Sequence, residues 1–244
     1  MEKKHAILLA FLITLVILGN WLFFHNFSIS RENVIISRVI DGDTVDLEDG
    51  RRIRLLNINT PEKGLPFADA AANFLKDFQD ESLEMENAGV EKYGRTLGKL
   101  YEQGDYINLE IVRLGYAHAY LVDPSELNDF KAAEKEAIEK GRGIWQKSEY
   151  SSCLNVNLNK QAEYVGIEDN CNINFAGWTL KDESAKSYKL DKVKTHKFTI
   201  YSAKGKDGET EFYWGRGKAW NDDKDTVFIR DSKGFLAYYY AYGY

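Results

Sequence analysis

The chain has 244 residues, of which 44% are hydrophobic and 29% are charged, and it carries a net charge of −6 at pH 7. A chain of this length can form two domains, each with its own hydrophobic core. This composition excludes a disordered or a collagen-like protein.

The first 32 residues contain a long apolar segment. Residues 6–24 include Asn20 as their only strongly polar member, and Lys3 and Lys4 precede them. As a helix, this segment comes close to the roughly 30 Å thickness of the hydrocarbon core of a membrane. The lysines favour a cytoplasmic N-terminus, with the residues after 24 outside the cytoplasm. We therefore expect a single-pass transmembrane anchor; a cleaved signal peptide, which would release a secreted protein, is the alternative.

Residues 33–147 combine strand and helix patterns and contain all three prolines. The turn "EDG" between two alternating runs predicts a β-hairpin, and Pro66 is expected in the first turn of the first helix. This order of elements fits a small α+β barrel of the oligonucleotide-binding type, with helices packed against it. The expected strands lie within 33–58 (two or three of them, including 45–47 and 52–58), 82–87 and 98–103, and the expected helices lie within 66–80, 106–117 and 128–145.

Residues 148–244 contain no proline, and the polar segment "QKSEYSSC" joins them to the barrel region. Short strand patterns recur between turn-rich segments, which indicates an all-β antiparallel sandwich. The aromatic last segment is expected to be a packed terminal strand; a binding surface for nucleic acid, glycan or protein is the alternative. The expected strands lie within 162–169, 175–182, 196–202, 226–231 and 235–244.

The only two cysteines, Cys153 and Cys171, both lie in the part that is expected to be exported. Outside the cytoplasm a disulfide between them is favoured, and closing a loop of this size would stabilise the fold by roughly 3 kcal/mol. Two free buried thiols are the alternative.

Three short clusters offer side chains that could carry chemistry. Each is a weak signal alone, because an Asp-Gly-Asp turn or a Thr-Pro-Glu helix cap is common. The clusters are "VIDGDTV" with Asp41 and Asp43, "RLLNINTPE" with Arg54, Asn59, Thr60 and Glu62, and "EKYGR" with Lys92, Tyr93 and Arg95.

In this order, and followed by "LGY" and "GIW", the clusters resemble the thermonuclease (staphylococcal nuclease) family over nearly all of residues 34–147. The resemblance implies a five-stranded barrel with three helices. It also implies an enzyme that hydrolyses phosphodiester bonds of DNA and RNA with Ca²⁺ and leaves 3′-phosphates. The expected substrates are single-stranded or melted DNA and RNA.

The resemblance assigns a role to each matching residue. Arg54 and Arg95 would bind the scissile phosphate, and Glu62 would orient or deprotonate the attacking water. The metal ligands would be Asp43, Asn59 and the backbone carbonyl of Thr60. Substrate contacts would come from Lys92, Tyr93 and, as a looser match, Tyr120, whereas Val122 stands where the family has a second tyrosine.

These residue types suit the chemistry. The five-coordinate phosphorus carries extra negative charge on its non-bridging oxygens, which two guanidiniums can bind through paired donors. A divalent cation on the same oxygens adds Lewis-acid stabilisation, and a carboxylate can hold the attacking water in line. The four histidines show no zinc-ligand spacing.

Asn59 departs from the family, which has an aspartate at this position. An amide oxygen can ligate Ca²⁺, but one formal negative charge beside the ion is lost. We therefore expect a weaker metal site with the chemistry retained; a site that has lost catalysis is the alternative. Residues 33–147 hold 15 basic and 22 acidic residues, a net charge of −7, which favours local capture in a cleft over tight binding to long duplex unless the basic residues gather on one face.

The segments "GWTLKD" and 220–234 resemble the lamin-tail domain, an immunoglobulin-like sandwich, and the match covers about residues 153–244. This family is known for its fold and for its pairing with nucleases and membrane anchors more than for one activity. The resemblance therefore does not identify a ligand. The segment "WNDDKD" is expected to be a solvated acidic turn, because the spacing of a calcium loop is absent. No feature of the sequence indicates an obligate oligomer.

The sequence thus predicts three parts: an anchor and short linker at 1–32, a thermonuclease-like domain at 33–147 and a lamin-tail-like sandwich at 148–244. The expected function is an extracytoplasmic, membrane-anchored, calcium-dependent nuclease with a C-terminal targeting or binding module. A non-catalytic nucleic-acid-binding or surface scaffold protein is the alternative.

Overall fold

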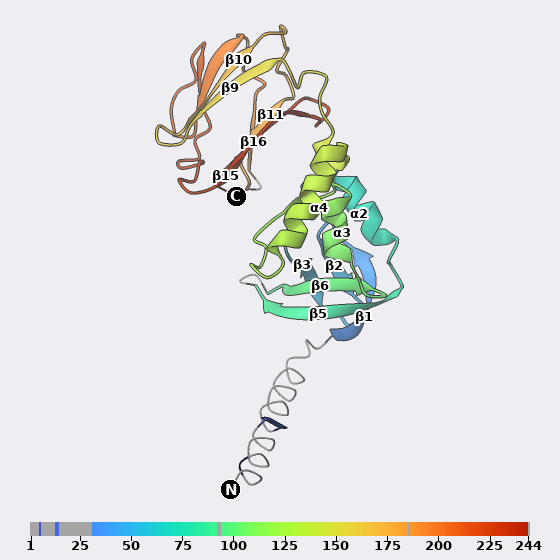
Figure 1. Cartoon of the computed structure of the whole chain (residues 1–244). Coiled ribbons are helices and arrows are strands. Elements are labelled where there is room, and N and C mark those ends of the chain that lie inside the picture. Colours follow the sequence, from blue (N-terminus) through green and yellow to red (C-terminus); the bar gives the residue numbers. More distant parts are fainter. Residues whose placement is uncertain (1–4, 6–12, 15–30, 92–93, 185, 244) are drawn as a thin grey trace.

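The computed structural model describes residues 5, 13–14, 31–91, 94–184 and 186–243 (Figure 1). The segment expected to be a membrane anchor, 6–24, lies outside the described residues except for positions 13 and 14. Within the described part of the chain, no helix is both long enough and apolar enough to span a membrane. The described residues from 31 onward form a barrel domain followed by a domain of two sheets (Figure 1).

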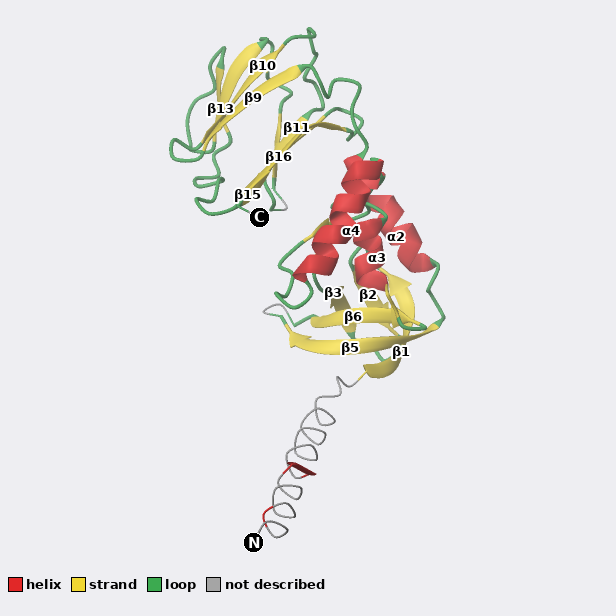
Figure 2. Ribbon diagram, in the orientation of Figure 1, coloured by secondary structure: helices red, strands yellow, loops and turns green. Residues whose placement is uncertain are grey.

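The N-terminal domain is a closed barrel of five strands. A sheet in the order β3-β2-β1-β5-β6-β7 is closed by parallel pairing of β3 with β6 (Figure 2). The short strands β4 (Ile58–Asn59) and β8 (His118–Ala119) pair separately. The barrel and its three helices agree with the architecture expected from the sequence. The strands of the sheet are β1 (Arg31–Val39), β2 (Thr44–Leu47), β3 (Arg52–Leu55), β5 (Ser82–Val90), β6 (Thr96–Glu102) and β7 (Asp105–Tyr106).

Three α-helices cover the barrel on the side that faces the second domain (Figure 2). They are α2 (Ala68–Lys76), α3 (Ile107–Arg113) and α4 (Leu127–Lys140). The first of them begins after Phe67, whose φ of 67° is left-handed, so Pro66 precedes the helix and does not lie in its first turn. The last ends at Gly141 with a left-handed φ of 58°, which glycine adopts without steric cost, and a 3₁₀ turn, η1 (Gly143–Trp145), follows.

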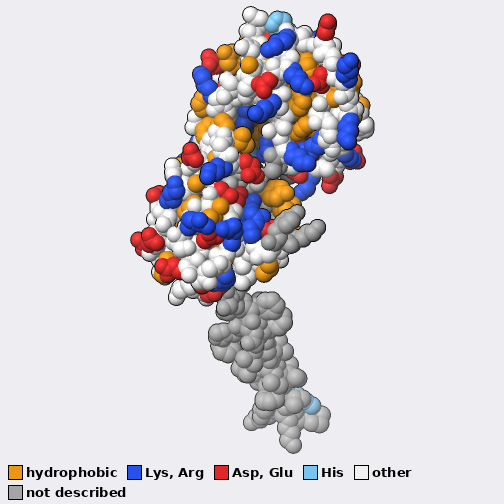
Figure 3. Space-filling view, turned by 180° about the vertical axis from the view of Figure 1, so that it is seen from behind, with side chains coloured by type: hydrophobic (Ala, Val, Ile, Leu, Met, Phe, Trp, Pro, Cys, Tyr) orange, Lys and Arg blue, Asp and Glu red, His pale blue; other side chains and the backbone are white. Residues whose placement is uncertain are grey.

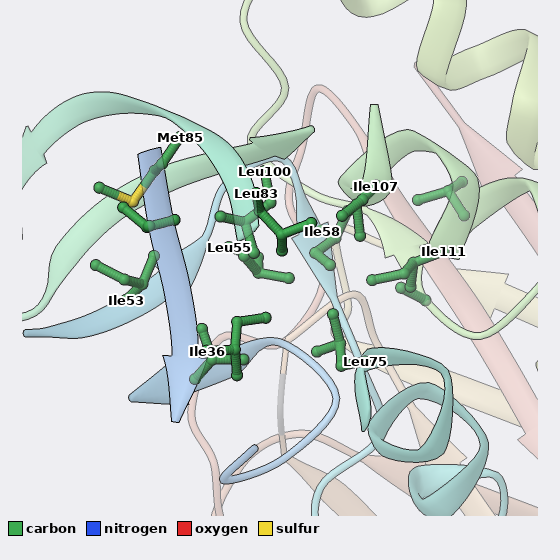
Figure 4. Packing of buried hydrophobic residues seen from close by; sticks show 14 of the residues in the cluster. Ile36, Ile53, Leu55, Ile58, Leu75, Leu83, Met85, Leu100, Ile107 and Ile111 are labelled. Carbon is green, nitrogen blue, oxygen red and sulfur yellow. The ribbon is translucent and has the colours of Figure 1, made fainter. Parts of the chain in front are cut away.

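The barrel interior is filled by aliphatic side chains. Alternate residues of each strand point inward, as the period of two requires, and Ile36, Ile53 and Leu55 are at most 1% exposed (Figure 4). Leu75 from α2 and Ile111 from α3 join the same cluster and cover one end of the barrel (Figure 4). The helices are therefore held by burial of their apolar faces against the barrel.

One polar side chain is fully buried in this core. Asn108 in α3 donates hydrogen bonds from Nδ2 to the carbonyls of Leu56 (2.9 Å) and Gly98 (3.1 Å). Its Oδ1 accepts a hydrogen bond from the backbone N–H of Leu100 at 3.1 Å. A buried polar group is tolerated when all its partners are supplied, so Asn108 fastens α3 to β6 and to the turn after β3.

The second domain consists of two four-stranded sheets that enclose one apolar core. Their orders are β14-β13-β10-β9 and β12-β11-β15-β16. Val165 and Phe198 from the first sheet and Leu180 and Val227 from the second belong to the same buried cluster. The strands are β9 (Leu154–Asn159), β10 (Tyr164–Asp169), β11 (Thr179–Lys181), β12 (Ser187–Lys189), β13 (Lys197–Tyr201), β14 (Glu211–Tyr213), β15 (Asp225–Arg230) and β16 (Leu236–Tyr242).

A disulfide joins Cys153, just before β9, to Cys171, just after β10. The two strands pair in antiparallel register, with Leu154 opposite Asp169. The bond therefore closes the open end of a hairpin and links residues 18 positions apart.

The two domains meet through a buried aromatic contact. Trp145 is 2% exposed, and its ring centroid lies 5.0 Å from His118 of the barrel domain and 5.1 Å from Tyr239 of the sandwich. The backbone N–H of Leu236 donates to the carbonyl of Gln146 at 2.8 Å. The barrel and the sandwich thus share one packed interface.

We expect Asn108→Ala to destabilise the barrel, because it leaves two buried carbonyls and one buried N–H without a partner. The expected loss is about 3 kcal/mol in the free energy of unfolding, measured by urea denaturation. The matched control is Asn73→Ala, which removes an exposed asparagine from α2 and should change stability by less than about 0.5 kcal/mol. Equal effects of the two changes would contradict the role of Asn108.

Candidate active site

A buried carboxylate lies at the centre of the candidate site. Asp43, in the turn between β1 and β2, is 7% exposed. Its Oδ2 accepts hydrogen bonds from the backbone N–H of Thr60 at 3.1 Å and from the hydroxyl of Thr60 at 2.9 Å. Gly42 makes this approach possible, since a Cβ there would lie 2.5 Å from the Cβ of Ala71 and 2.9 Å from the hydroxyl of Thr60.

Arg54 in β3 supplies positive charge to this carboxylate. Its Nη2 lies 3.1 Å from Oδ2 of Asp43, and it donates hydrogen bonds to the carbonyls of Leu55 at 2.8 Å and Ile58 at 3.0 Å. The guanidinium has five N–H donors, and these hydrogen bonds use two of them, so donors remain for a substrate phosphate. Arg54 is therefore held in one orientation by fixed acceptors.

Opposing interactions act on the pKa of Asp43. Burial raises the pKa of Asp43, and the nearby carboxylate of Asp41 raises it further, while Arg54 and the hydrogen bonds from Thr60 lower it. The pKa remains above its ordinary value despite the arginine. Additional positive charge at this position would therefore favour the ionised carboxylate.

Arg95, just before β6, completes the charged cluster. Its Nε donates to a carboxylate oxygen of Glu91. That hydrogen bond raises the pKa of Arg95, and the charges of Asp43 and Asp41 contribute in the same direction. Arg95 therefore lies in the electrostatic field of the Asp43 cluster and stays cationic.

Glu62 and Asn59 lie on either side of Thr60 and Pro61 at the mouth of the site. Asn59 ends β4 and is half-buried, whereas Glu62 is exposed to solvent. Both line a cavity of about 230 Å³ that also borders the sandwich. As an exposed carboxylate, Glu62 is available to water and to a substrate.

Of the three residues expected to contact substrate, the structure describes only Tyr120. Lys92 and Tyr93 lie outside the described residues. Tyr120 is half-buried, and its backbone N–H donates to the carbonyl of Asn57 at 2.9 Å. Its side chain lines neither the cavity beside Glu62 nor the arginine groove described below.

The oxygen donors of this site fit a hard divalent cation. Among the described residues, no group of three or more His, Cys, Asp or Glu side chains could hold a metal. The expected ligand set has one such side chain, Asp43, together with the Asn59 amide and the Thr60 carbonyl, all of them oxygen donors of the kind that Ca²⁺ takes. Because the pKa of Asp43 is raised by burial, a cation would stabilise its ionised form.

An open groove of about 780 Å³ on the barrel surface is lined by three arginines, Arg38, Arg52 and Arg95. Asp46 accepts hydrogen bonds from Arg52 at 2.7 Å and from Arg38 at 2.5 Å, and these bonds lower the pKa of Asp46 to about 2. Of these residues, the sequence-based prediction named Arg95 but missed Arg38, Asp46 and Arg52. The alternation of Arg52 and Arg54 in β3 is a signal that the two side chains share a face of the strand.

Glu91 is a further residue that the prediction missed. It lies four positions before Arg95, a spacing usually read as a helical ion pair. Here neither residue belongs to a helix, and the backbone N–H of Glu91 donates to the carbonyl of Arg95 at 3.0 Å. The pair therefore spans a turn, which sequence spacing alone did not indicate.

Comparisons with known proteins agree with the barrel fold. The family model described as "Staphylococcal nuclease homologue" matches residues 52–147. The chain is 33% identical over 130 residues to "Thermonuclease" of Staphylococcus intermedius, a match that covers 48% of this chain and 77% of that protein. It is 33% identical over 126 residues to "Micrococcal nuclease" of Shigella flexneri, covering 45% of this chain and 71% of that protein.

A third relative is much longer than the matched region. The chain is 30% identical over 139 residues to "Endonuclease YhcR" of Bacillus subtilis, and the match covers 47% of this chain but 11% of that protein. The family model ends where the barrel domain ends, so the lamin-tail resemblance of residues 148–244 stays a prediction. The closed barrel, the order of its charged motifs and these relatives together show that the chain belongs to the staphylococcal nuclease family.

Proposed function

We propose that the barrel domain is a nuclease that hydrolyses phosphodiester bonds of DNA, RNA or both with the help of Ca²⁺ and leaves 3′-phosphates. The observation that carries this proposal is the buried Asp43 carboxylate, ion-paired with Arg54 at 3.1 Å, in a chain of this family. Relatives of the barrel domain are named as nucleases and endonucleases.

The chain's own residues supply most of the proposed chemistry. Glu62 holds the attacking water in line with the phosphorus and accepts its proton. As the water oxygen bonds to phosphorus, the bond from phosphorus to the 5′-oxygen breaks, the phosphate stays on the 3′-oxygen, and the leaving 5′-oxygen takes up a proton from solvent. Arg54 and Arg95 bind the non-bridging oxygens as their negative charge increases in the transition state. A Ca²⁺ ion held by Asp43, Asn59 and the Thr60 carbonyl would add Lewis-acid stabilisation of the same oxygens.

The exposed position of Glu62 and the buried position of Asp43 support this division of labour. A carboxylate that activates water needs access to solvent and to the substrate. A carboxylate that binds a cation is most effective where water is excluded, because charges interact more strongly at low dielectric. The two acidic groups therefore suit different tasks.

We expect Glu62→Gln to lower kcat by about 10²- to 10⁴-fold, because glutamine keeps the shape of the side chain but cannot accept a proton. Substrate affinity should change little, since the carboxylate does not bind the phosphate. The measurement is cleavage of a fluorescent single-stranded oligonucleotide with Ca²⁺, repeated with EDTA. The matched control is Glu81→Gln, an exposed glutamate that lines neither cavity.

A wild-type chain without metal-dependent cleavage would exclude the enzyme and favour the alternative, a non-catalytic nucleic-acid-binding or scaffold protein.

We expect Asn59→Asp to lower the Ca²⁺ concentration required for half-maximal binding by about tenfold, because it restores a negative charge beside the ion. The measurement is calorimetric titration with Ca²⁺, which does not depend on activity. The control is Asn73→Asp, which adds the same charge at an exposed position of α2. Unchanged Ca²⁺ affinity in Asn59→Asp would contradict the charge argument.

We also propose that residues 6–24 anchor the chain in a membrane, with the N-terminus in the cytoplasm and the two described domains outside it. The support comes from the apolar composition of that segment, the lysines before it and the disulfide between Cys153 and Cys171, a bond typical of oxidising compartments. In this arrangement the lamin-tail-like sandwich is the targeting or binding module.

We expect the full chain expressed in cells to co-sediment with membranes and to be digested by protease added from outside. Both results follow if residues 6–24 span the bilayer with the larger part of the chain outside. Recovery of the intact protein in the medium would indicate a cleaved signal peptide, and protection from protease would contradict the topology.

A further inference from the structure

The cavity of about 230 Å³ beside Glu62 is built by both domains. The barrel contributes Asn59, Thr60 and Glu62, and the sandwich contributes Lys181, Lys189 and Arg230. Lysine and arginine side chains lie on both domains along the junction between them (Figure 3). The candidate catalytic glutamate therefore shares a cavity with three cations from a different domain.

Lys181, the last residue of β11, is the central cation of the sandwich side. Within the described residues its ammonium has no hydrogen bond or carboxylate ion pair, and its nearest recorded aromatic partner is Phe228, with Nζ 5.9 Å from the ring centroid. Burial and the neighbouring Arg230 lower the pKa of Lys181 to about 8, while Asp182 and Glu62 oppose this change. The ammonium is thus charged at pH 7 and lies within the field of Glu62.

Arg230, at the end of β15, is held in place by the interface itself. Its Nη1 donates to the carbonyl of Ile144 at 2.5 Å and to the carbonyl of Gly234 at 3.1 Å. Burial lowers the pKa of Arg230 to about 10, so it too is charged at pH 7. Two like charges close together in a partly dehydrated space are unfavourable unless an anion lies between them.

The carboxylates that line this cavity, Glu62 and Asp231, offset the three cations only in part. Asp231 accepts hydrogen bonds from the hydroxyl of Ser148 and from the backbone N–H groups of Lys233 and Phe235. Asp182 is paired with Arg216. Glu62 is exposed and belongs to the proposed water site. Three cations against two carboxylates leave an excess of positive charge in the lining, which favours an external anion.

The cavity also has an apolar side. Phe67, Ile144 and Phe228 line it together with the three cations. His118 lies in the same wall, and burial lowers its pKa to about 4, so its imidazole is neutral at pH 7. A volume of about 230 Å³ with cations and apolar rings suits a ligand that combines one phosphate with a flat or ring-shaped organic group.

We propose that this cavity binds one nucleotide of the substrate next to the scissile bond, with its phosphate on Lys181, Lys189 and Arg230 of the sandwich. This inference rests on the proposed nuclease function. The scissile phosphate remains with Arg54 and Arg95, and the adjoining nucleotide extends past Glu62 into the cavity. The sandwich thereby becomes part of the substrate-binding site and is more than a targeting module.

The position of Glu62 supports this assignment. Glu62 and Thr60 line the cavity with the cations of the sandwich, and Thr60 is hydrogen-bonded to Asp43, the ion-pair partner of Arg54. A polynucleotide that crosses the candidate site must continue beyond the scissile phosphate, and the cavity offers positive charge at that side. The arginine groove with Arg38 and Arg52 offers positive charge at another place on the barrel.

The test uses the full chain carrying Glu62→Gln, so that substrate is bound but not cleaved. Fluorescence anisotropy measures binding of a short labelled oligothymidylate over a range of salt concentrations. We expect Lys181→Met to weaken binding by about tenfold and to reduce the slope of log K against log salt by about 0.7, the value for one phosphate contact on a single strand. Lys189→Met should reduce the slope in the same way.

Two variants separate charge from packing. Lys204→Met, which removes an exposed lysine of the sandwich outside the cavity, should leave affinity and slope unchanged. Lys181→Arg should retain binding, because it keeps the positive charge. If Lys181→Arg loses as much affinity as Lys181→Met, or if Lys181→Met binds like Lys204→Met at every salt concentration, the nucleotide subsite is excluded.

Cleavage assays without the Glu62→Gln change distinguish failure of this inference from failure of the proposed function. Metal-dependent cleavage by the wild type, with unchanged KM in Lys181→Met, would leave the nuclease in place and remove the subsite. No cleavage by the wild type, with the expected loss of binding in Lys181→Met, would remove the nuclease and leave a nucleic-acid-binding cavity. Binding of an acidic peptide in place of the oligothymidylate would contradict the proposal.

Discussion

The contact that the rest of the structure depends on is the burial of Trp145 between the two domains. Its ring packs against His118 on one side and against Phe228 and Tyr239 of the sandwich on the other. Large aromatic side chains contribute strongly to interfaces because they remove much apolar area from water. This contact fixes the sheet that carries Lys181 and Arg230 beside the turn that carries Glu62, and so it defines the cavity between them.

On the barrel side of the cavity, the site is held together by an ion pair and its hydrogen bonds. Asp43 is buried beside Arg54, and both are bound to backbone groups of the segment that runs from β3 to Thr60. Breaking such a buried pair by removing one partner leaves an uncompensated charge. The same contacts that hold the turn also keep the two groups in the orientation required for a cation and a phosphate. Stability of the loop and organisation of the site are therefore properties of one cluster.

Much of the barrel was predictable from sequence because local patterns determine its elements. The hairpin around "EDG", the apolar spacing of α2 and the glycine that ends α4 each depend on neighbouring residues. Pro66 was placed wrongly by a short distance, because the left-handed conformation of Phe67 delays the start of α2. The ring of Phe67 packs against Phe235 of the distant sandwich, with centroids 6.0 Å apart, a contact that the local sequence does not indicate.

The sequence nominated the candidate site residues but not the partners that the structure gives them. The motif order identified Asp43, Arg54 and Glu62, but the sequence does not show that Arg54 pairs with Asp43 or that Glu91 binds Arg95. The cavity could not be predicted at all. It brings Glu62 together with Lys181 and Arg230, which are more than a hundred positions away in the chain, and only the docking of two domains creates that proximity.

The way the sandwich is joined to the barrel has a consequence for the entropy of binding. The N–H of Leu236 is bonded to Gln146 and the N–H of Ser148 to Leu236, so the segment between the domains is paired with β16 and is not a free tether. A flexibly linked module acts through its effective concentration, and its long side chains lose about 0.5–1.5 kcal/mol each when a ligand immobilises them. Here Arg230 is already immobilised by two carbonyls. The conformational entropy of the Arg230 side chain is therefore lost when the chain folds. Binding of a ligand in the cavity does not have to immobilise this side chain again, so that entropy loss does not lower the affinity.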